Sequence, residues 1–337
     1  MVDLSTDYLG LKLKNPLVPS ASPLSRSLDE ARKLEDAGAA ALVMYSLFEE
    51  ALRSEEAMLD RFLLDQTIGH AEASGFMPAP HAYRSSLDHY LEQIHALKSS
   101  LEIPVIASLN GVSPSGWIEL GAELQQAGAH ALELNVYYVA GNIEQTGHDV
   151  EQRYLDLLRA LRARVDIPIV MKLAPYFSSL PHFVRQVEKA GAQGVSLFNR
   201  FFQPDIYLED LSIVDQLRLS SSEDSLLAMR WIAILYGRTR LSLAATGGVH
   251  TADDALKMLL AGADVVHMAS ALLQHGPSRL AEVLDGIRVW METNEYESVT
   301  QMKGSLSQQH QKDPSVFARE SYIRVLDSFS PPDGVWR

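Results

Sequence analysis

Hydrophobic residues in this chain fall into short runs that are apolar at every position, and amphipathic segments separate these runs. A strand buried on both faces has such a uniform pattern, whereas a helix lying on a sheet has a single apolar stripe. Alternation of the two segment types is typical of parallel β-α-β units. Eight runs are candidate strands, and they lie near residues 17–20, 41–45, 104–109, 131–135, 168–172, 194–198, 241–245 and 264–268.

A recurring glycine motif marks the ends of four predicted helices. The motif reads DAGAAALVMY, QAGAHALELN, KAGAQGVSLF and LAGADVVHMA, and in each copy a glycine stands between an amphipathic segment and an apolar run. Glycine just past a helix tolerates the backbone turn that ends it. The starts of two helices are indicated by capping-box spacing, in Ser27 with Glu30 and in Thr251 with Asp254.

Eight strands that alternate with helices predict a closed (β/α)8 barrel, known as a TIM barrel. Residues 3–14 predict a small hairpin, with Gly10 at its turn, that covers the bottom of the barrel. The connections after strands 2 and 6, residues 47–86 and 200–222, are longer than a loop requires, and such connections carry the active sites of barrel enzymes. A doubly wound sheet is disfavoured because no G-x-G-x-x-G follows any strand.

The chain has 337 residues, of which 47% are hydrophobic, so it can bury a large core. We expect the barrel to span residues 1–310 and a helical extension, with a helix near 315–328, to span residues 311–337. Neither a signal-peptide pattern nor an apolar stretch of about 18–20 residues occurs, which predicts a soluble cytoplasmic protein without a membrane partner.

Charge and cysteine content narrow the chemistry. The net charge of −14 argues against nucleic acid as a partner, because the phosphate backbone attracts basic surfaces, so a small molecule is expected instead. The sequence has no cysteine, which excludes disulfides, Cys-ligated zinc or iron–sulfur clusters and thiolate nucleophiles. No metal site is predicted.

Polar and small residues follow the predicted strands where parallel strands converge on one barrel mouth. A polar residue at one strand end is more often structural than catalytic, but the whole set indicates a pocket for a planar polar ligand with an anionic anchor. The set consists of Ala21, Ser22, Tyr45, Ser46, Ser108, Asn110, Asn135, Tyr137, Tyr138, Lys172, Asn199, Arg200, Thr246, Gly247, Gly248, Ala269 and Ser270.

Two features of this set point to particular chemistry. The small-residue turns at Gly247-Gly248 and Ala269-Ser270 follow strands 7 and 8, where barrels commonly bind phosphate. Lys172, in VMKLAPY, enters from an apolar strand, so it must meet an anion or titrate. It would stabilise negative charge on a bound ring, act as a Schiff-base nucleophile, or form a structural ion pair.

Several segments resemble, in order, the FMN-dependent dihydroorotate dehydrogenase family. They are NPLVPSASPL, ASLNG, LELN, VMKLAPY, VSLFN, ATGGVHTADDALKMLLAGADVVHMASALLQHGP and YESVTQMKGSLS, from about residue 3 to 305. The last segment leans toward the branch shared with bacterial dihydropyrimidine dehydrogenase subunits and dihydroorotate dehydrogenase-like proteins.

The resemblance implies an FMN site at the barrel mouth. Lys172 would lie by the N1 and O2 side of the flavin, where its charge favours the reduced ring. The residues that match cofactor positions of the family are Ala21, Ser22, Ser46, Asn110, Asn135, Lys172, Asn199, Gly247, Gly248, Ala269 and Ser270. Asn135 and Asn199 would also contact substrate.

The substrate positions depart from the family pattern. Met44-Tyr45-Ser46 replaces a segment that typically contains lysine, and Ala140 replaces an asparagine. Tyr138 stands where the family keeps the Cys or Ser base, so the resemblance implies that Tyr138 is the acid or base of the reaction, unless it only packs. Arg200 replaces a small hydroxyl residue and would bind a substrate carboxylate, unless it forms a surface ion pair.

The sequence therefore predicts an FMN-dependent oxidoreductase that transfers hydride between flavin and a dihydropyrimidine-like CH–CH group, dihydroorotate if the family function is kept. One alternative is a flavin-binding subunit that has another substrate or has lost its own chemistry. The other is a lyase with Lys172 as a Schiff base.

The absence of cysteine also bears on electron transfer. Without a Cys-ligated iron–sulfur relay of its own, the chain would pass electrons to a soluble acceptor or to a separate electron-transfer subunit. The resemblance also implies a homodimer.

Overall fold

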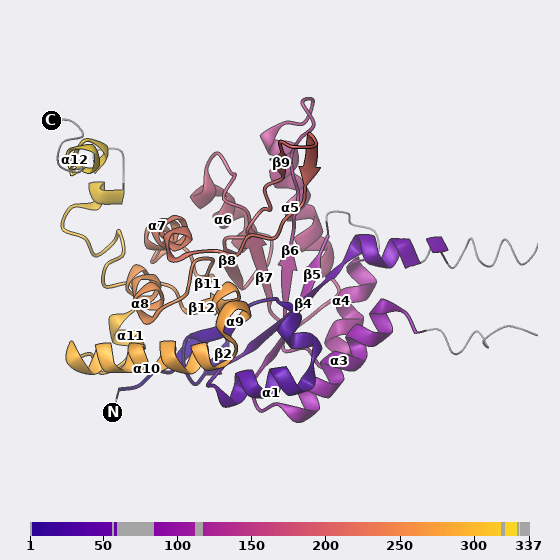
Figure 1. The fold of residues 1–337 in the computed structure, drawn as a ribbon, viewed down its shortest axis with the longest axis horizontal. Helices are drawn as coiled ribbons and strands as arrows, with labels where there is room; N and C mark the ends of the chain where they lie inside the picture. The colour runs from indigo at the N-terminus through magenta and orange to yellow at the C-terminus, as the bar shows by residue number, and fades with distance from the viewer. Residues whose placement is uncertain are drawn as a thin grey trace, which may run out of the picture.

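The computed structural model describes residues 2–55, 57–58, 84–111, 117–317, 321–328 and 330. Eight parallel strands form one sheet, wrapped into a nearly closed barrel with helices around it (Figure 1). The strands are, in spatial order, β3 (Leu17–Pro19), β12 (Val265–Met268), β11 (Ser242–Thr246), β8 (Gly194–Leu197), β7 (Ile169–Leu173), β6 (Ala131–Asn135), β5 (Val105–Asn110) and β4 (Leu42–Phe48). The predicted (β/α)8 barrel is confirmed.

The sheet is least regular where its first and last members meet. β3 and β4 are not paired as neighbouring strands, but the Ala40 N–H donates to the Leu17 carbonyl at 3.0 Å across this junction. β4 also shifts its register against β5 between Val43 and Ser46. This irregularity changes which side chains of β4 face the barrel interior.

The helices that follow the strands pack around the barrel. They are α1 (Leu28–Asp36), α3 (Ser86–Ser100), α4 (Trp117–Gln126), α5 (Gly147–Arg162), α6 (Leu180–Lys189), α7 (Ser225–Leu235), α8 (Ala252–Ala261), α9 (Ser270–His275) and α10 (Ser278–Thr293). The motif glycines Gly38, Gly128, Gly191 and Gly262 all have positive φ, between 105° and 124°, as the helix-end interpretation requires.

The two predicted capping boxes differ. At Thr251 both reciprocal bonds with Asp254 form at the start of α8. At the start of α1, the Ser27 hydroxyl accepts from the Glu30 N–H at 3.3 Å, but the Glu30 carboxylate instead pairs with Lys33 at 2.6 Å. The sequence spacing therefore located both helix starts, although only one is a full capping box.

The N-terminal hairpin covers the barrel bottom, as predicted. Its strands are β1 (Thr6–Tyr8) and β2 (Leu11–Leu13), and Leu9 and Gly10 have positive φ at the turn between them. Tyr8 and Leu9 are buried in the same apolar cluster as the lowest inward-facing strand residues, including Val170 and Val265. The Leu9 N–H also donates to the Ser242 hydroxyl at 3.0 Å, which ties the turn to β11.

The long connection after β8 forms an antiparallel hairpin of β9 (Asp205–Tyr207) and β10 (Ser212–Val214), which projects from the mouth end in Figure 1. It is followed by the short 3-10 turn η3 (Ser222–Asp224). In the other long connection, residues 49–55 are helical, and residues 59–83 lie outside the described part of the chain.

The first part of the C-terminal region packs against the outer helices of the barrel, and the last part lies away from the barrel. After α11 (Val299–Met302), the Gly304 and Leu306 N–H groups donate to carbonyls of α8. In the region where a helix was predicted near 315–328, the described residues form η4 (Pro314–Phe317) and α12 (Ser321–Asp327), and α12 lies apart from the barrel in Figure 1. A domain division at residue 310 stays a prediction.

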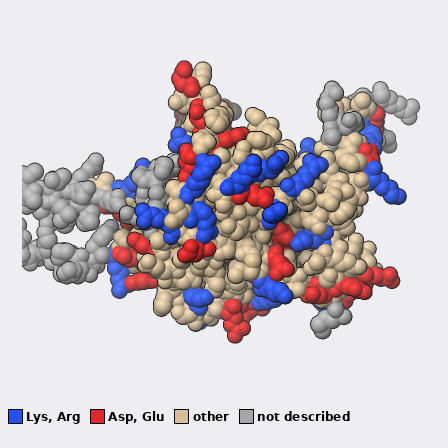
Figure 2. All heavy atoms as spheres, turned by 180° about the vertical axis from the view of Figure 1, so that it is seen from behind, with Lys and Arg blue, Asp and Glu red and all other residues tan. Residues whose placement is uncertain are grey.

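No helix within the described ranges is long and apolar enough to cross a bilayer. Figure 2 shows the face opposite to that of Figure 1, where many basic side chains form a band across the upper half and acidic ones lie on the projection at the top as well as along the lower edge. Charges of the two signs are therefore unevenly distributed on this face.

Leu9→Ala should lower the free energy of unfolding by about 2–4 kcal/mol, because it removes a buried side chain from the plug of the barrel. Lys12→Ala, at an exposed position of the same hairpin, serves as the control. Urea denaturation measures both variants. If the two variants were equally stable, the conclusion that the N-terminal hairpin closes the barrel bottom would be contradicted.

Candidate active site

The carboxyl ends of the barrel strands open onto a cavity of about 770 Å³. Every residue predicted to bind cofactor or substrate lines this cavity. These residues are Ala21, Ser22, Ser46, Asn110, Asn135, Lys172, Asn199, Arg200, Gly247, Gly248, Ala269 and Ser270. A volume of this size suits a cofactor with part of a substrate. The structure thus brings the predicted set together, although the role of each member stays a prediction.

Strand periodicity produces a polar layer beneath the cavity. Successive side chains of a strand point to opposite faces, so residues two apart face the same way. Two positions above the apolar bottom layer, seven strands carry a buried polar or charged residue, and we call this set the polar layer: Ser20, Ser108, Glu133, Lys172, Ser196, Thr246 and His267. The floor of the pocket is therefore polar although the barrel below it is apolar.

Lys172 and Glu133 form the charged centre of this layer. The Lys172 ammonium lies 3.3 Å from Glu133 Oε1 and 3.5 Å from the Ser20 hydroxyl. The Glu133 side chain is wholly buried, and that of Lys172 is 9% exposed, on the cavity side. Burial of either charge alone would be costly, so each is stabilised by the other. The anion that Lys172 was expected to meet is therefore present within the chain.

His267, next to this pair, is neutral at physiological pH. Burial lowers its pKa to about 4, and the Lys172 charge acts in the same direction, while Glu133 opposes both. Its Nδ1 lies 3.9 Å from Glu133 Oε2. Neither ring nitrogen has a hydrogen-bond partner among the described residues, and His267 lines the cavity. An unsatisfied buried imidazole at the floor is suited to a polar ligand.

Amides and hydroxyls hold the rim above the floor. The Asn199 side chain donates to Asn135 Oδ1 at 2.6 Å, which joins the ends of β8 and β6. The Ser46 and Ser108 hydroxyls are hydrogen-bonded at 2.9 Å. These contacts hold in place three cavity-lining groups, those of Asn135, Asn199 and Ser46, that can exchange hydrogen bonds with the edge of a planar ring.

The glycine turn after β11 exposes backbone to the cavity. Gly247 has φ 96°, and a Cβ built there would meet no atom within 4 Å. Gly248 has φ 73°, and its Cβ would lie 2.8 Å from the Ser221 carbonyl, so a larger residue does not fit. The Ser270 hydroxyl accepts from the Ser220 N–H at 3.1 Å. This open backbone with small residues opposite it is a fitting place for an anionic group.

The two adjacent tyrosines after β6 point in different directions. Tyr137 lines the cavity, its hydroxyl accepts from the Phe202 N–H at 2.9 Å, and its ring packs on Phe201 with a centroid distance of 4.3 Å. Tyr138 is not among the lining residues. Its hydroxyl donates to Gln145 at 2.5 Å, and Arg153 covers its ring. The structure therefore separates Tyr138, the predicted acid or base, from the residues with which it was expected to act.

Arg26 was not anticipated as a site residue. Its guanidinium lies over the Tyr45 ring, 4.8 Å from the centroid, and both residues line the cavity. Of the lysines and arginines in the lining, Lys172 pairs with Glu133, Arg200 with Asp224 at 3.6 Å, and Arg218 with Asp205. For Arg26 the described part of the chain holds no carboxylate partner, so its charge is available to a ligand.

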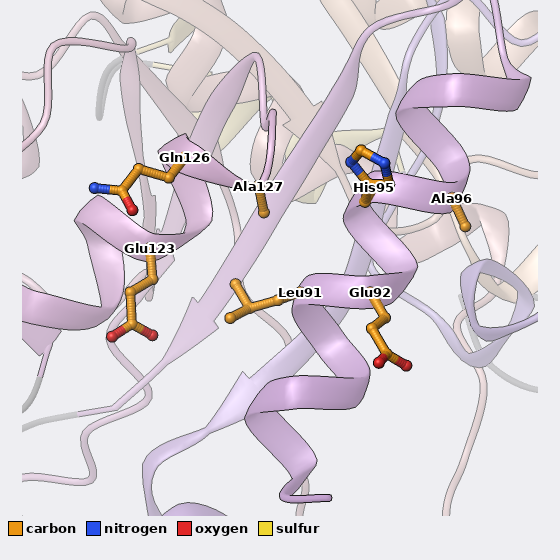
Figure 3. Close-up of a pocket in the computed structure, with 7 residues that line it drawn as sticks. All are labelled: Leu91, Glu92, His95, Ala96, Glu123, Gln126 and Ala127. Atoms are coloured by element: carbon orange, nitrogen blue, oxygen red, sulfur yellow. The ribbon is translucent and has the colours of Figure 1, made fainter.

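A second hollow lies on the barrel wall. It has a volume of about 540 Å³ and lies between α3 and α4, where Leu91 points from α3 toward α4 (Figure 3). Glu92, His95, Glu123 and Gln126 also line it. None of the predicted site residues lines it. It is separate from the strand ends, so the cavity at the mouth is the candidate active site.

Comparison with known proteins assigns the family. The model of the family described as dihydroorotate dehydrogenase matches residues 74–291. A protein of Aeropyrum pernix, whose name gives it provisionally as dihydroorotate dehydrogenase A (fumarate), is 28% identical over 86% of this chain and 94% of its own length. The catalytic subunit of dihydroorotate dehydrogenase B (NAD(+)) from Pyrococcus abyssi is 27% identical, covering 89% and 98%. That from Thermoplasma acidophilum is 25% identical, covering 90% and 99%.

The pKa of His267 predicts a component of acid destabilisation. In the unfolded chain, His267 binds a proton below its usual pKa of about 6.5. In the folded chain it stays neutral until the pH falls to about 4. Stability should therefore fall by roughly 3 kcal/mol as the pH drops through this window, and His267→Gln should remove that component. Urea unfolding between pH 7 and pH 4 measures it, with His89→Gln, at an exposed position of α3, as the control. Parallel pH profiles of the wild type and His267→Gln would contradict the assignment.

Proposed function

We propose that this chain, which belongs to the dihydroorotate dehydrogenase family of flavin-dependent oxidoreductases, binds FMN at the barrel mouth and oxidises dihydroorotate or a closely similar dihydropyrimidine. The observation that carries the proposal is the convergence of every predicted FMN-contacting residue on one cavity. Membership of this family leaves no reason to assign Lys172 a Schiff-base role, and its ammonium is already ion-paired with Glu133.

The cavity has suitable partners for each part of FMN. Gly247 and Ser270, from the turns after β11 and β12, would hold the phosphate through backbone N–H groups. Ala21 and Ser22 would lie along the ring, which needs small residues for close approach, and Ser46 and Asn110 would contact its edge. Asn135, Asn199 and Lys172 would contact both ring and substrate. When bound, the flavin supplies the acceptor for the hydride that leaves the substrate.

Tyr137 is the better candidate for the acid or base than Tyr138, because only Tyr137 faces the cavity. The Phe202 N–H donates to its oxygen and holds it in place, while the hydroxyl proton stays free for a ligand. In oxidation, the deprotonated oxygen of Tyr137 would take the proton of one substrate carbon, and the flavin, when bound, would supply the acceptor for the hydride of the neighbouring carbon. In the reverse direction Tyr137 returns the proton.

Tyr137→Phe should slow flavin reduction by dihydroorotate by roughly 100-fold or more, since acid–base groups contribute about 10²–10⁴ to rates. Tyr138→Phe, the matched control, should stay within a few fold of wild type. Anaerobic stopped-flow absorbance at the flavin bands measures both. A slow Tyr138→Phe beside a fast Tyr137→Phe would return the role to Tyr138. If dihydroorotate does not bleach the wild type, the alternative of a flavin subunit with another substrate, or none, is favoured.

The substrate carboxylate would bind Arg26. Tyr45, at a position where the family typically has lysine, provides a ring that holds the Arg26 guanidinium beside the cavity. Arg200, the residue expected from sequence to bind a carboxylate, already lies 3.6 Å from Asp224. An arginine without a carboxylate partner gains more from a ligand anion than one that has to exchange partners.

Arg26→Gln should weaken orotate binding by about tenfold and leave uracil, which lacks the carboxylate, unchanged. Perturbation of the flavin spectrum measures both ligands in the same protein. Arg200→Gln should have the smaller effect on orotate. If Arg200→Gln carries the whole loss, then Arg200 binds the carboxylate, as the sequence suggested.

We also propose that electrons leave the flavin to a separate subunit or a soluble acceptor. The Pyrococcus and Thermoplasma relatives are named as catalytic subunits of an NAD(+) enzyme, and this chain has no cysteine for an iron–sulfur cluster of its own. A homodimer, carried over from the family resemblance, belongs to the same proposal.

A further inference from the structure

Glu133 is a wholly buried carboxylate that stands behind the proposed flavin site. It lies on β6 two residues before Asn135, so both side chains point into the barrel, with Asn135 nearer the mouth. Asn135, Lys172 and His267 line the cavity, whereas Glu133 does not. A negative charge is thus fixed one layer below the surface that a ligand would touch.

Lys172 is the partner that neutralises this charge. Its ammonium is 3.3 Å from Glu133 Oε1. The other ionisable groups near Glu133 are uncharged at neutral pH. Burial lowers the pKa of His267 to about 4, and burial raises the pKa of Tyr8 and of Tyr90 well above its usual value, with the charge of Glu133 acting in the same direction on both tyrosines. Within the described residues, Glu133 Oε2 has no hydrogen-bond partner. The electrostatics of the floor therefore depend on the balance of two charges.

We propose that Glu133 is a positioning residue that holds the Lys172 ammonium below the flavin and offsets its charge. Resting on the proposed flavin site, this means that the ring faces an ion pair and not an unpaired cation. Lys172 favours the additional negative charge of a reduced ring, and Glu133 opposes it from farther away in a poorly solvated interior, where charges interact strongly. The difference between the two effects sets how readily the flavin accepts electrons.

Glu133→Gln keeps the shape of the side chain and removes its charge. The FMN-loaded variant should have a higher flavin midpoint potential and should bind sulfite about tenfold more tightly, because the sulfite complex of a flavin carries added negative charge. Dye-coupled reduction measures the potential, and a spectral titration measures sulfite. Glu123→Gln, the same change at an exposed position of α4, should leave both values unchanged.

Glu133→Asp and a double variant separate charge from structure. Glu133→Asp, which keeps a carboxylate, should shift both values less than Glu133→Gln. Should Glu133→Gln fail to fold, Glu133→Gln with Lys172→Met removes both charges and leaves none unpaired. Its midpoint potential should lie above that of Lys172→Met alone, in which Glu133 has lost its counter-charge.

An unchanged potential and sulfite affinity in flavin-loaded Glu133→Gln would overturn the proposal, as would equal potentials in the double variant and Lys172→Met. Neither readout uses dihydroorotate, so a chain that dihydroorotate fails to reduce, against the proposed function, would still give the result expected for Glu133. A wild type that binds no flavin would contradict both.

Discussion

The ion pair between Glu133 and Lys172 is the interaction on which the candidate site depends. Both side chains project into a barrel whose lower layer is apolar and is closed by Tyr8 and Leu9 of the hairpin. A charge placed there alone would be strongly destabilising, so the two must occur together. With these two residues, the layer of the barrel interior directly beneath the cavity is polar, while the layer below it remains an apolar packed core.

The residues around this polar layer contribute different groups to the site, depending on whether they lie at strand ends, in turns or in the long connections. Strand ends supply side chains with little freedom, such as Asn135 and Asn199, which are hydrogen-bonded to each other. The turns supply backbone, at Gly247 above all. The long connection after β8 supplies the Phe202 N–H that fixes Tyr137, so a segment outside the barrel orients the group proposed to move the proton. The proposed ring contacts thus come largely from strand ends, whereas the proposed phosphate contacts and proton transfer depend on turns and loops.

Much of the fold could be predicted from sequence, and so could the gathering of small and polar residues at the barrel mouth. Runs such as VVHMA and IVMKL are apolar enough to mark strands buried on both faces, and glycines such as Gly262 mark where the helices end. The polar layer was also open to prediction, because Glu133 and His267 each lie two residues above an inward-facing apolar residue. The capping-box spacing correctly located the start of α1. It did not predict that the Glu30 carboxylate pairs with Lys33 and does not accept from the Ser27 N–H.

The residues proposed to act on substrate could not be predicted, because they lie where strand periodicity ends. β6 ends at Asn135, and beyond it alternation no longer decides which of Tyr137 and Tyr138 faces the cavity. Arg26 reaches Tyr45 from a 3-10 turn, η1 (Pro23–Arg26), far from it in sequence. The register shift in β4 also changes which of its side chains face the barrel interior, so strict alternation along the strand would predict some orientations wrongly.

The most direct test of the account is the absorption spectrum of the protein purified without added cofactor, followed by identification of any flavin released with acid. If the barrel mouth binds FMN as proposed, the spectrum will show flavin bands and the protein will release an equimolar amount of FMN. A colourless protein that takes up no FMN when it is supplied would contradict it.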